Sequence, residues 1–200
     1  MVVVACNSAS STSLPTLQAM FRIPIVGVIE PGAKAGTKAT RNKRIGVIGT
    51  NATIRSQAYQ KKITEIMPEA NVYAKPCPLF VPLAEEGWLN HPATRIIAEE
   101  YLTPLKEEGI DTLVLGCTHY PLLMDTIQDV MGEDVTLVEP GRETAKAIKA
   151  VLEEKGWLRE GEPISPEFYL TDIPANFATI GTRFLRRPLP TIEKVNITPA

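Results

Sequence analysis

The sequence lacks the features that mark membrane-spanning, secreted and nucleic-acid-binding proteins. None of its apolar runs approaches the roughly eighteen residues of a membrane helix. The opening run "MVVVAC" is shorter than the core of a signal peptide and carries no basic leader. Lysine and arginine form no cluster, and the formal net charge is -2, which argues against nucleic acid or an anionic membrane surface as a partner. We therefore expect a cytoplasmic protein that acts on a small molecule.

Cysteine and histidine are also scarce. Three cysteines at wide separations do not form a disulfide framework, so we expect Cys6, Cys77 and Cys117 to be reduced thiols. The chain has two histidines, and the pair Cys117-x-His119 lacks the spacing and the further ligands of a zinc site. The sequence therefore predicts no metal site.

The sequence does contain a regular alternation of short β-branched runs with amphipathic helical patterns. The expected strands cover residues 2–5, 25–29, 44–48, 71–74, 112–115, 135–138 and 167–170. The expected helices cover residues 11–21, 32–39, 53–67, 94–106, 121–131, 142–155 and 175–185. Apolar strands that alternate with helices are typical of parallel sheets covered on both faces. We therefore predict an α/β fold with mostly parallel sheets flanked by helices.

Part of this pattern occurs twice. After a helix, "VVVACNS" is followed by "PIVGVIEPG", and "LVLGCTH" is followed in the same way by "VTLVEPG". The spacing from Cys6 to Glu30 nearly equals that from Cys117 to Glu139. The repeat predicts two pseudo-symmetric lobes, between which the chain crosses at the Glu-Pro-Gly turns. The first lobe would comprise residues 1–29 and 140–200, and the second residues 30–139. The alternative is a chance likeness, since βα units share a common pattern.

Both repeated motifs place a cysteine at the carboxyl end of a strand. Ligands of open parallel sheets bind at this edge, next to the N-termini of the helices that follow. Hydroxyl residues at 10–12 can cap the helix after Cys6, and Pro121 suits the first turn after Cys117. Such helix starts would bind a carboxylate and lower a thiol pKa from about 8.5 toward neutrality. The alternative is a cysteine that only packs, and we apply it to Cys77, which lies between two prolines.

Two such cysteines allow three kinds of chemistry. A disulfide switch would bring the thiols together, and a hydrolase would use Cys6 or Cys117 as nucleophile with His119 as its base. Equivalent thiols on opposite sides of a cleft could instead remove a proton from one face of a substrate and return one to the other face. The matching sequence contexts favour this last arrangement.

Four motifs, "ACNSAS", "IGVIGTNAT", "CPLFVPLAEEG" and "GCTHYP" in this order, resemble those of the glutamate racemases in the aspartate/glutamate racemase superfamily. The resemblance covers nearly the whole chain. It implies two α/β lobes around a pseudo-twofold axis, with the substrate enclosed between them. It also implies conversion of L-glutamate to D-glutamate for peptidoglycan, without a metal and without a cofactor such as pyridoxal phosphate.

The resemblance also implies roles for individual residues. Cys6 and Cys117 match the two proton donors and acceptors, one for each enantiomer. Glu85 matches an auxiliary acidic residue, while a solvated helix charge explains it equally well. Thr50 and Thr53 could contact the substrate, but capping of a helix is the simpler interpretation. The residues that match positions holding the substrate or supporting a thiol are Asn7, Ser8, Thr118 and His119.

The chain departs from the family's pattern at its start. It lacks the strand ending in Asp-Ser-Gly and the Tyr-Gly motif that precede the first cysteine in the family. We therefore expect an N-terminally truncated first lobe, a fragment with little activity by itself, and exposed apolar surface on strand 2–5. Such a surface favours pairing with another chain, for example in a homodimer. Two other interpretations stay open: a two-cysteine racemase for aspartate or hydantoins, and a non-catalytic α/β binding module.

Overall fold

The computed structural model describes residues 1–162, 164–173 and 176–197. The chain forms two compact units, Met1–Leu158 and Arg159–Ala200. Both units contain helices and parallel strand pairs. This confirms the predicted α/β class.

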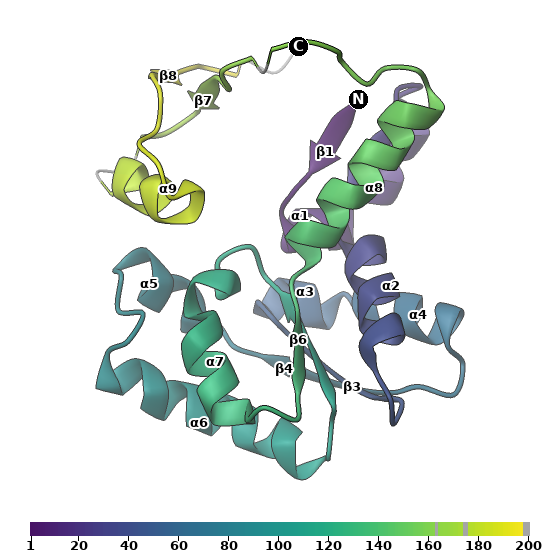
Figure 1. Ribbon diagram of the computed structural model, residues 1–200, viewed down its shortest axis with the longest axis vertical. Helices are drawn as coiled ribbons and strands as arrows, with labels where there is room; N and C mark the ends of the chain where they lie inside the picture. Colours follow the sequence, from purple (N-terminus) through teal and green to yellow (C-terminus); the bar gives the residue numbers. More distant parts are fainter. Residues whose placement is uncertain (163, 174–175, 198–200) are drawn as a thin grey trace. The chain divides into compact units, whose positions relative to one another are not determined.

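A parallel four-stranded sheet forms the centre of the first unit (Figure 1). Its strands in spatial order are β4 (Asn71–Pro76), β3 (Arg44–Gly49), β5 (Thr112–Gly116) and β6 (Thr136–Val138). Every residue of β5 is buried, because this strand has a neighbour on either side and helices above and below. Gly49 and Gly116 are register partners, so β3 and β5 end side by side directly before Cys117.

Gly116 allows this close approach of the two strand ends. A Cβ atom at Gly116 would lie 2.6 Å from the carbonyl oxygen of Ile48 on β3. Because interiors are close-packed, a side chain at this position would push β3 and β5 apart. The pairing of β3 with β5 therefore requires a residue without a side chain at position 116, directly before Cys117.

Helices cover both faces of this sheet (Figure 1). They are α2 (Ile29–Ala39), α4 (Ala58–Ile66), α5 (Phe80–Glu85), α6 (Pro92–Glu107) and α7 (Met124–Met131). On one face, α2 and α4 bury apolar residues against Ile45, Val47 and Val114. On the other face, α5, α6 and α7 pack against Ile48 and Leu115. Neighbours such as Val114 and Leu115 thus serve opposite faces, as the two-residue period of a strand requires.

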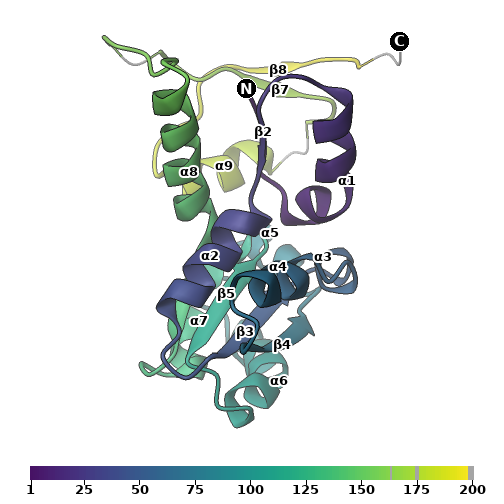
Figure 2. The same cartoon turned by 90° about the vertical axis from the view of Figure 1, so that its right-hand side faces the viewer.

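A separate parallel pair of strands, β1 (Val2–Val4) and β2 (Ile25–Gly27), belongs to the same unit. Helix α1 (Asn7–Met20) connects the two strands and packs against both (Figure 2). Helix α8 (Pro140–Glu154) packs against α2 and β2. Val2 and Val3 are 43% and 37% exposed, in line with the exposed apolar surface expected for this strand.

Helix α1 begins earlier than predicted. It starts at Asn7, directly after Cys6, which is its N-cap residue with an extended backbone. The hydroxyl residues that we expected to cap the helix lie inside it, where Ser11 and Thr12 donate hydrogen bonds to the carbonyl of Ser8. Such bonds to the preceding turn leave the helix intact. The first cysteine is therefore closer to a helix start than the sequence indicated.

Other helix boundaries also differ from the prediction. Both Glu-Pro-Gly motifs begin helices instead of forming turns: Glu30 lies in the first turn of α2, and Glu139 is the N-cap residue of α8. Proline fits a first turn because the N–H groups there have no partner within the helix. The expected helix 53–67 is divided into α3 (Asn51–Arg55) and α4, since Gln57 takes a left-handed conformation with φ of 57°.

The second unit contains β7 (Phe168–Leu170), α9 (Phe177–Leu185) and β8 (Ile192–Lys194). Strands β7 and β8 pair in parallel. The order of β7 and α9 matches the predicted strand 167–170 and helix 175–185, although the expected helix start at 175 lies outside the described residues. The division into lobes 1–29 with 140–200 and 30–139 stays a prediction. Within the described part of the chain, no helix has the length and apolar character needed to cross a membrane.

Asp111 fixes the loop between α2 and β3. Its carboxylate accepts hydrogen bonds from the hydroxyl of Thr40 (2.6 Å), the backbone N–H groups of Arg41 (2.6 Å) and Asn42 (2.7 Å), and the hydroxyl of Thr112 (3.0 Å). Burial by itself would raise the pKa of Asp111, but these four hydrogen bonds together hold the pKa below its usual value. The ionised carboxylate therefore stabilises the fold.

We expect Asp111→Asn to lower the free energy of unfolding by about 1.5–3 kcal/mol at pH 7, because one carboxylate oxygen becomes a donor facing other donors. A depressed pKa contributes stability above the unfolded value of about 3.9 that is lost as the pH falls through the lower folded value. The difference between the two proteins should therefore shrink in strong acid. Urea unfolding at pH 7 and pH 3 measures it. An equal difference at both pH values would contradict the assignment.

Candidate active site

The two repeated cysteines are carried by neighbouring parts of the first unit. Cys6 follows β1, and Cys117 follows β5. The hydroxyl of Thr118 donates a hydrogen bond to the carbonyl of Ala5 over 3.1 Å, so the residues beside the two cysteines are in direct contact. The thiols differ in burial, since Cys117 is 7% exposed whereas Cys6 is exposed.

The buried environment of Cys117 keeps its thiol protonated. Burial is the main reason that its pKa rises to about 11. The backbone N–H groups of His119 and Tyr120 hydrogen-bond to the sulfur and lower the pKa, while negative charge on Cys6 and Glu85 raises it. At neutral pH, Cys117 is therefore a thiol and a potential proton donor.

This result corrects the expected shift of the thiol pKa toward neutrality. The expectation assumed that an α-helix starts directly after Cys117. Instead, a 3-10 helix at Tyr120–Leu123 comes first, and the eight-residue α7 begins only at Met124. The positive end of a helix acts within about its first turn, so it is too distant to outweigh burial of the sulfur.

A cluster of three hydroxyls joins α1 to α3. Ser8 Oγ lies 2.8 Å from Thr50 Oγ1 and 3.1 Å from Thr53 Oγ1, and the two threonine oxygens are 3.1 Å apart. Thr50 Oγ1 also accepts a hydrogen bond from the N–H of Thr53, which confirms that Thr50 caps a helix. The cluster brings hydrogen-bonding groups from "CNS" and "GTNAT" together, although they are distant in sequence.

Asn7, the first residue of α1, is buried beside this cluster. Its side-chain oxygen Oδ1 accepts a hydrogen bond from the hydroxyl of Tyr59 over 2.7 Å. Asn7 is only 4% exposed, so its amide cannot turn freely into water. Asn7, which we predicted to contact the substrate, is thus held in place by Tyr59 of α4.

His119 lies between a carboxylate and the buried thiol. Its Nε2 is 3.2 Å from Oε1 of Glu85, and its Nδ1 is 4.0 Å from Sγ of Cys117. Glu85 is the last residue of α5, whose Phe80 packs edge-on against the ring of Tyr120. An imidazole held in this way can stabilise or exchange the proton of the neighbouring thiol. The arrangement favours the auxiliary interpretation of Glu85 over a solvated charge.

A cavity of about 50 Å³ adjoins the two cysteine-bearing segments. Asn7, Cys117, Thr118 and Glu139 are among the residues that line it. This volume suits one or two water molecules. A substrate the size of an amino acid would therefore lie mainly on the open side, where Thr118 and Cys6 are exposed.

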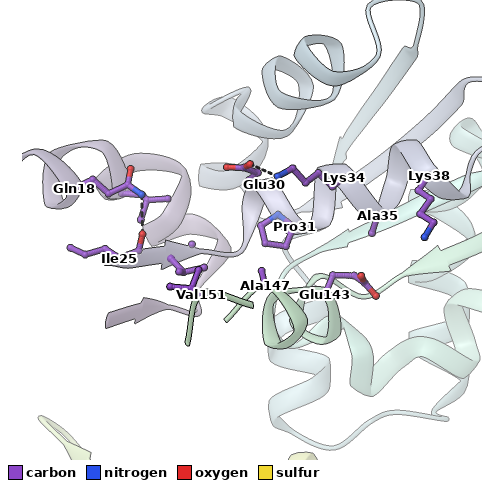
Figure 3. A pocket seen from close by; sticks show the side chains of 13 residues that line it. Gln18, Ile25, Glu30, Pro31, Lys34, Ala35, Lys38, Glu143, Ala147 and Val151 are labelled. Atoms are coloured by element: carbon purple, nitrogen blue, oxygen red, sulfur yellow. Dashed lines mark hydrogen bonds and ion pairs between the residues drawn. The ribbon is translucent and has the colours of Figure 1, made fainter. Parts of the chain in front are cut away.

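Figure 3 shows a larger groove of about 410 Å³, whose lining includes no cysteine. Residues of α1, β2, α2 and α8 line it. An ion pair between Glu30 and Lys34 (2.6 Å) lies on its wall, and Gln18 donates a hydrogen bond to the carbonyl of Ile25. None of the predicted site residues borders this groove, so it is separate from the candidate site.

All seven predicted site residues lie in the first unit, in two adjoining groups. One group follows β1 and contains Cys6, Asn7 and Ser8; the other contains Glu85, Cys117, Thr118 and His119. The structure places Cys77 in the apolar core, which confirms the packing interpretation. Sequence reasoning missed Tyr59, since an apolar position of an amphipathic helix gave no sign of its contact with Asn7.

Comparisons with known proteins show which family the chain belongs to. Residues 1–148 match the Asp/Glu/Hydantoin racemase family. A glutamate racemase from Geobacter metallireducens is 48% identical over 98% of this chain and 73% of its own length. One from Syntrophus aciditrophicus is 44% identical over the same shares of the two chains.

Solved structures of glutamate racemases have the same fold. An isoform from Bacillus anthracis gives a TM-score of 0.92 at 37% identity, over 98% of this chain and 73% of that one. The enzyme from Francisella tularensis, solved in complex with D-glutamate, gives 0.90 at 33% identity, over 97% and 72%. With both its sequence and its fold matched over nearly its full length, the chain belongs to the Asp/Glu/Hydantoin racemase family.

Proposed function

We propose that this chain interconverts L- and D-glutamate by proton transfer between Cys6 and Cys117, and that the D-glutamate serves peptidoglycan synthesis. The observation that carries the proposal is the direct contact between the two cysteine-bearing strand ends, through Thr118 and Ala5. The chain is a racemase by family, and its relatives above are glutamate racemases. This favours glutamate over aspartate or hydantoins as substrate.

The unequal burial of the thiols assigns the order of proton transfer. The high pKa of Cys117 makes it the proton donor of the resting protein, so the exposed Cys6 accepts the Cα proton. Cys117 then delivers its proton to the opposite face of the carbanion. The protein is left with a Cys6 thiol and a Cys117 thiolate, and this state acts on the other enantiomer.

The groups around the thiols can hold the substrate and stabilise the carbanion. Asn7, Ser8 and Thr118 carry amide and hydroxyl donors beside the two cysteines. The N-terminus of α1, a helix of 14 residues, adds partial positive charge at Cys6. Charge that develops at Cα spreads to the carboxylate, so fixed donors at that group lower the barrier. Glu85 and His119 set the protonation of Cys117 from the other side.

Proton exchange at Cα tests this function. The chain is incubated with L- or D-glutamate in D₂O, the Cα–H signal is followed by NMR, and inversion is followed by optical rotation. In line with the little activity that we expect of this chain by itself, we expect slow exchange and inversion of both enantiomers, and still slower exchange of aspartate. Near-normal turnover of glutamate would contradict the expected low activity. Faster exchange with aspartate or a hydantoin would identify a different racemase. Absence of both exchange and glutamate binding would favour a non-catalytic module.

We expect Glu85→Gln to lower kcat for glutamate by about 10- to 100-fold, because His119 loses the carboxylate that orients its ring. The loss should be larger in the direction that starts from the Cys117 thiolate, since His119 adjoins that sulfur. Rates from each enantiomer measure the asymmetry. Glu86→Gln, on the exposed neighbouring residue, is the matched control. Equal rates for Glu85→Gln and the control would exclude the auxiliary role.

Two further features belong to the proposal. A cytoplasmic location is in line with an enzyme that acts on a small-molecule substrate, and assembly into a homodimer is supported by the exposed Val2 and Val3 of β1. Both remain predictions.

A further inference from the structure

Tyr59 connects the two cysteine-bearing regions of the first unit. It comes from α4, is 1% exposed, and reaches Asn7 of α1 with its hydroxyl. Two glycines leave room for it. A Cβ atom at Gly32 would lie 2.9 Å from the Tyr59 hydroxyl oxygen, and one at Gly116 would lie 3.2 Å from Cε2 of its ring. The ring therefore fills a space that α2 and β5 keep free of side chains.

The direction of this hydrogen bond decides which atom of Asn7 stays available. Burial, with a smaller contribution from charge on Cys117, raises the pKa of Tyr59, so its hydroxyl keeps its proton and donates to Asn7 Oδ1. A flipped amide would leave that buried hydroxyl proton without an acceptor. The Nδ2 group of Asn7 therefore points away from Tyr59.

The Nδ2 group of Asn7 is available to a ligand near the Cys117 thiol. Within the described part of the chain, no residue accepts a hydrogen bond from Asn7 Nδ2. Asn7 and Cys117 line the same cavity. An amide donor at this position could donate a hydrogen bond to an anionic group of a ligand bound between Cys6 and Cys117.

We propose that Tyr59 is a positioning residue of the racemase site, whose hydroxyl holds Asn7 so that Nδ2 donates to the substrate carboxylate. This role rests on the proposed glutamate racemase function. It differs from simple packing, because it depends on one hydroxyl and acts through one other residue.

Kinetics of Tyr59→Phe test the proposal. We expect kcat/KM to fall at least about tenfold for both enantiomers, with a higher KM and a lower kcat, because a donor at the carboxylate holds the bound substrate and also stabilises the charge that spreads there in the transition state. Tyr73→Phe, in partly buried strand β4, is the matched control and should leave both constants unchanged. A loss of kcat with unchanged KM would indicate a merely structural role and overturn the proposal.

A double substitution shows whether Tyr59 acts through Asn7. Asn7→Ala removes the positioned group, so adding Tyr59→Phe to it should change KM by less than about twofold. Additive effects of the two substitutions on KM would contradict the proposal.

A third measurement needs no turnover. The side-chain ¹⁵N signal of Asn7, identified by its absence in Asn7→Ala, should show rigid {¹H}-¹⁵N relaxation in the unmodified chain. In Tyr59→Phe it should approach the relaxation of the exposed Asn51 side chain. Unchanged relaxation would overturn the positioning role. A chain that fails to exchange glutamate would instead refute the proposed function, while this signal still decides whether Tyr59 fixes Asn7.

Discussion

Cys117→Ala should lower kcat/KM for glutamate racemisation by at least about 10³-fold, because no other group on that side can supply the proton that completes inversion. The exposed Cys6 should still remove the Cα proton of one enantiomer and return solvent deuterium to the same face. We therefore expect exchange without inversion for that enantiomer only. NMR of the Cα signal, together with optical rotation, separates the two processes.

The reciprocal variant Cys6→Ala and the control Cys77→Ala complete this test. Cys6→Ala should abolish inversion equally and leave exchange, if any, to the opposite enantiomer. Cys77→Ala removes a thiol from the apolar core and should retain normal kcat. Normal inversion by either the Cys6 or the Cys117 variant would refute the two-base assignment.

Phe80→Ala should lower the free energy of unfolding by about 3–5 kcal/mol, the range for large buried aromatic residues. Phe80 is fully buried and packs edge-on against Tyr101 and Tyr120, each with its ring centre 5.3 Å away. Such ring pairs add to the apolar burial. The cavity left behind would lie between α5 and the 3-10 helix after Cys117. Urea unfolding followed by circular dichroism measures the change.

A neighbouring residue provides the comparison for Phe80. Leu79 is 48% exposed, so Leu79→Ala should change the free energy of unfolding by less than about 1 kcal/mol. We also expect Phe80→Ala to weaken the Glu85–His119 contact, because Phe80 packs α5, which carries Glu85, against Tyr120, which follows His119. A loss below about 1 kcal/mol for Phe80→Ala would show that this packing does not hold α5.

The sequence predicted those parts of the fold that depend on local pattern. The run from Thr112 to Leu115 has only apolar or β-branched residues, and the strand there is buried throughout. Cys77, enclosed by prolines and followed by no polar pair, lies in the core as expected. The motifs around Cys6 and Cys117 indicated the racemase family, which the comparisons confirm.

Features that depend on tertiary structure were not predictable in this way. Helix α5 was not among the expected helices; its Pro82 lies in the first turn, where proline is tolerated. The pKa of Cys117 depends on burial that no short motif reveals. The hydrogen bond from Tyr59 to Asn7 joins residues 52 positions apart, and only the folded chain brings them together.

The absence of a side chain at Gly116 also limits how substrate preference can change. A Cβ atom at this position would meet the Ile48 carbonyl oxygen and the Tyr59 ring, so no side chain fits at the strand end directly before Cys117. A new substrate side chain could not be accommodated by substitution there. We therefore expect variation in specificity within this scaffold to arise at the partly exposed Ser8 and Thr50 and at the exposed Thr118, while the strand end directly before Cys117 stays constant.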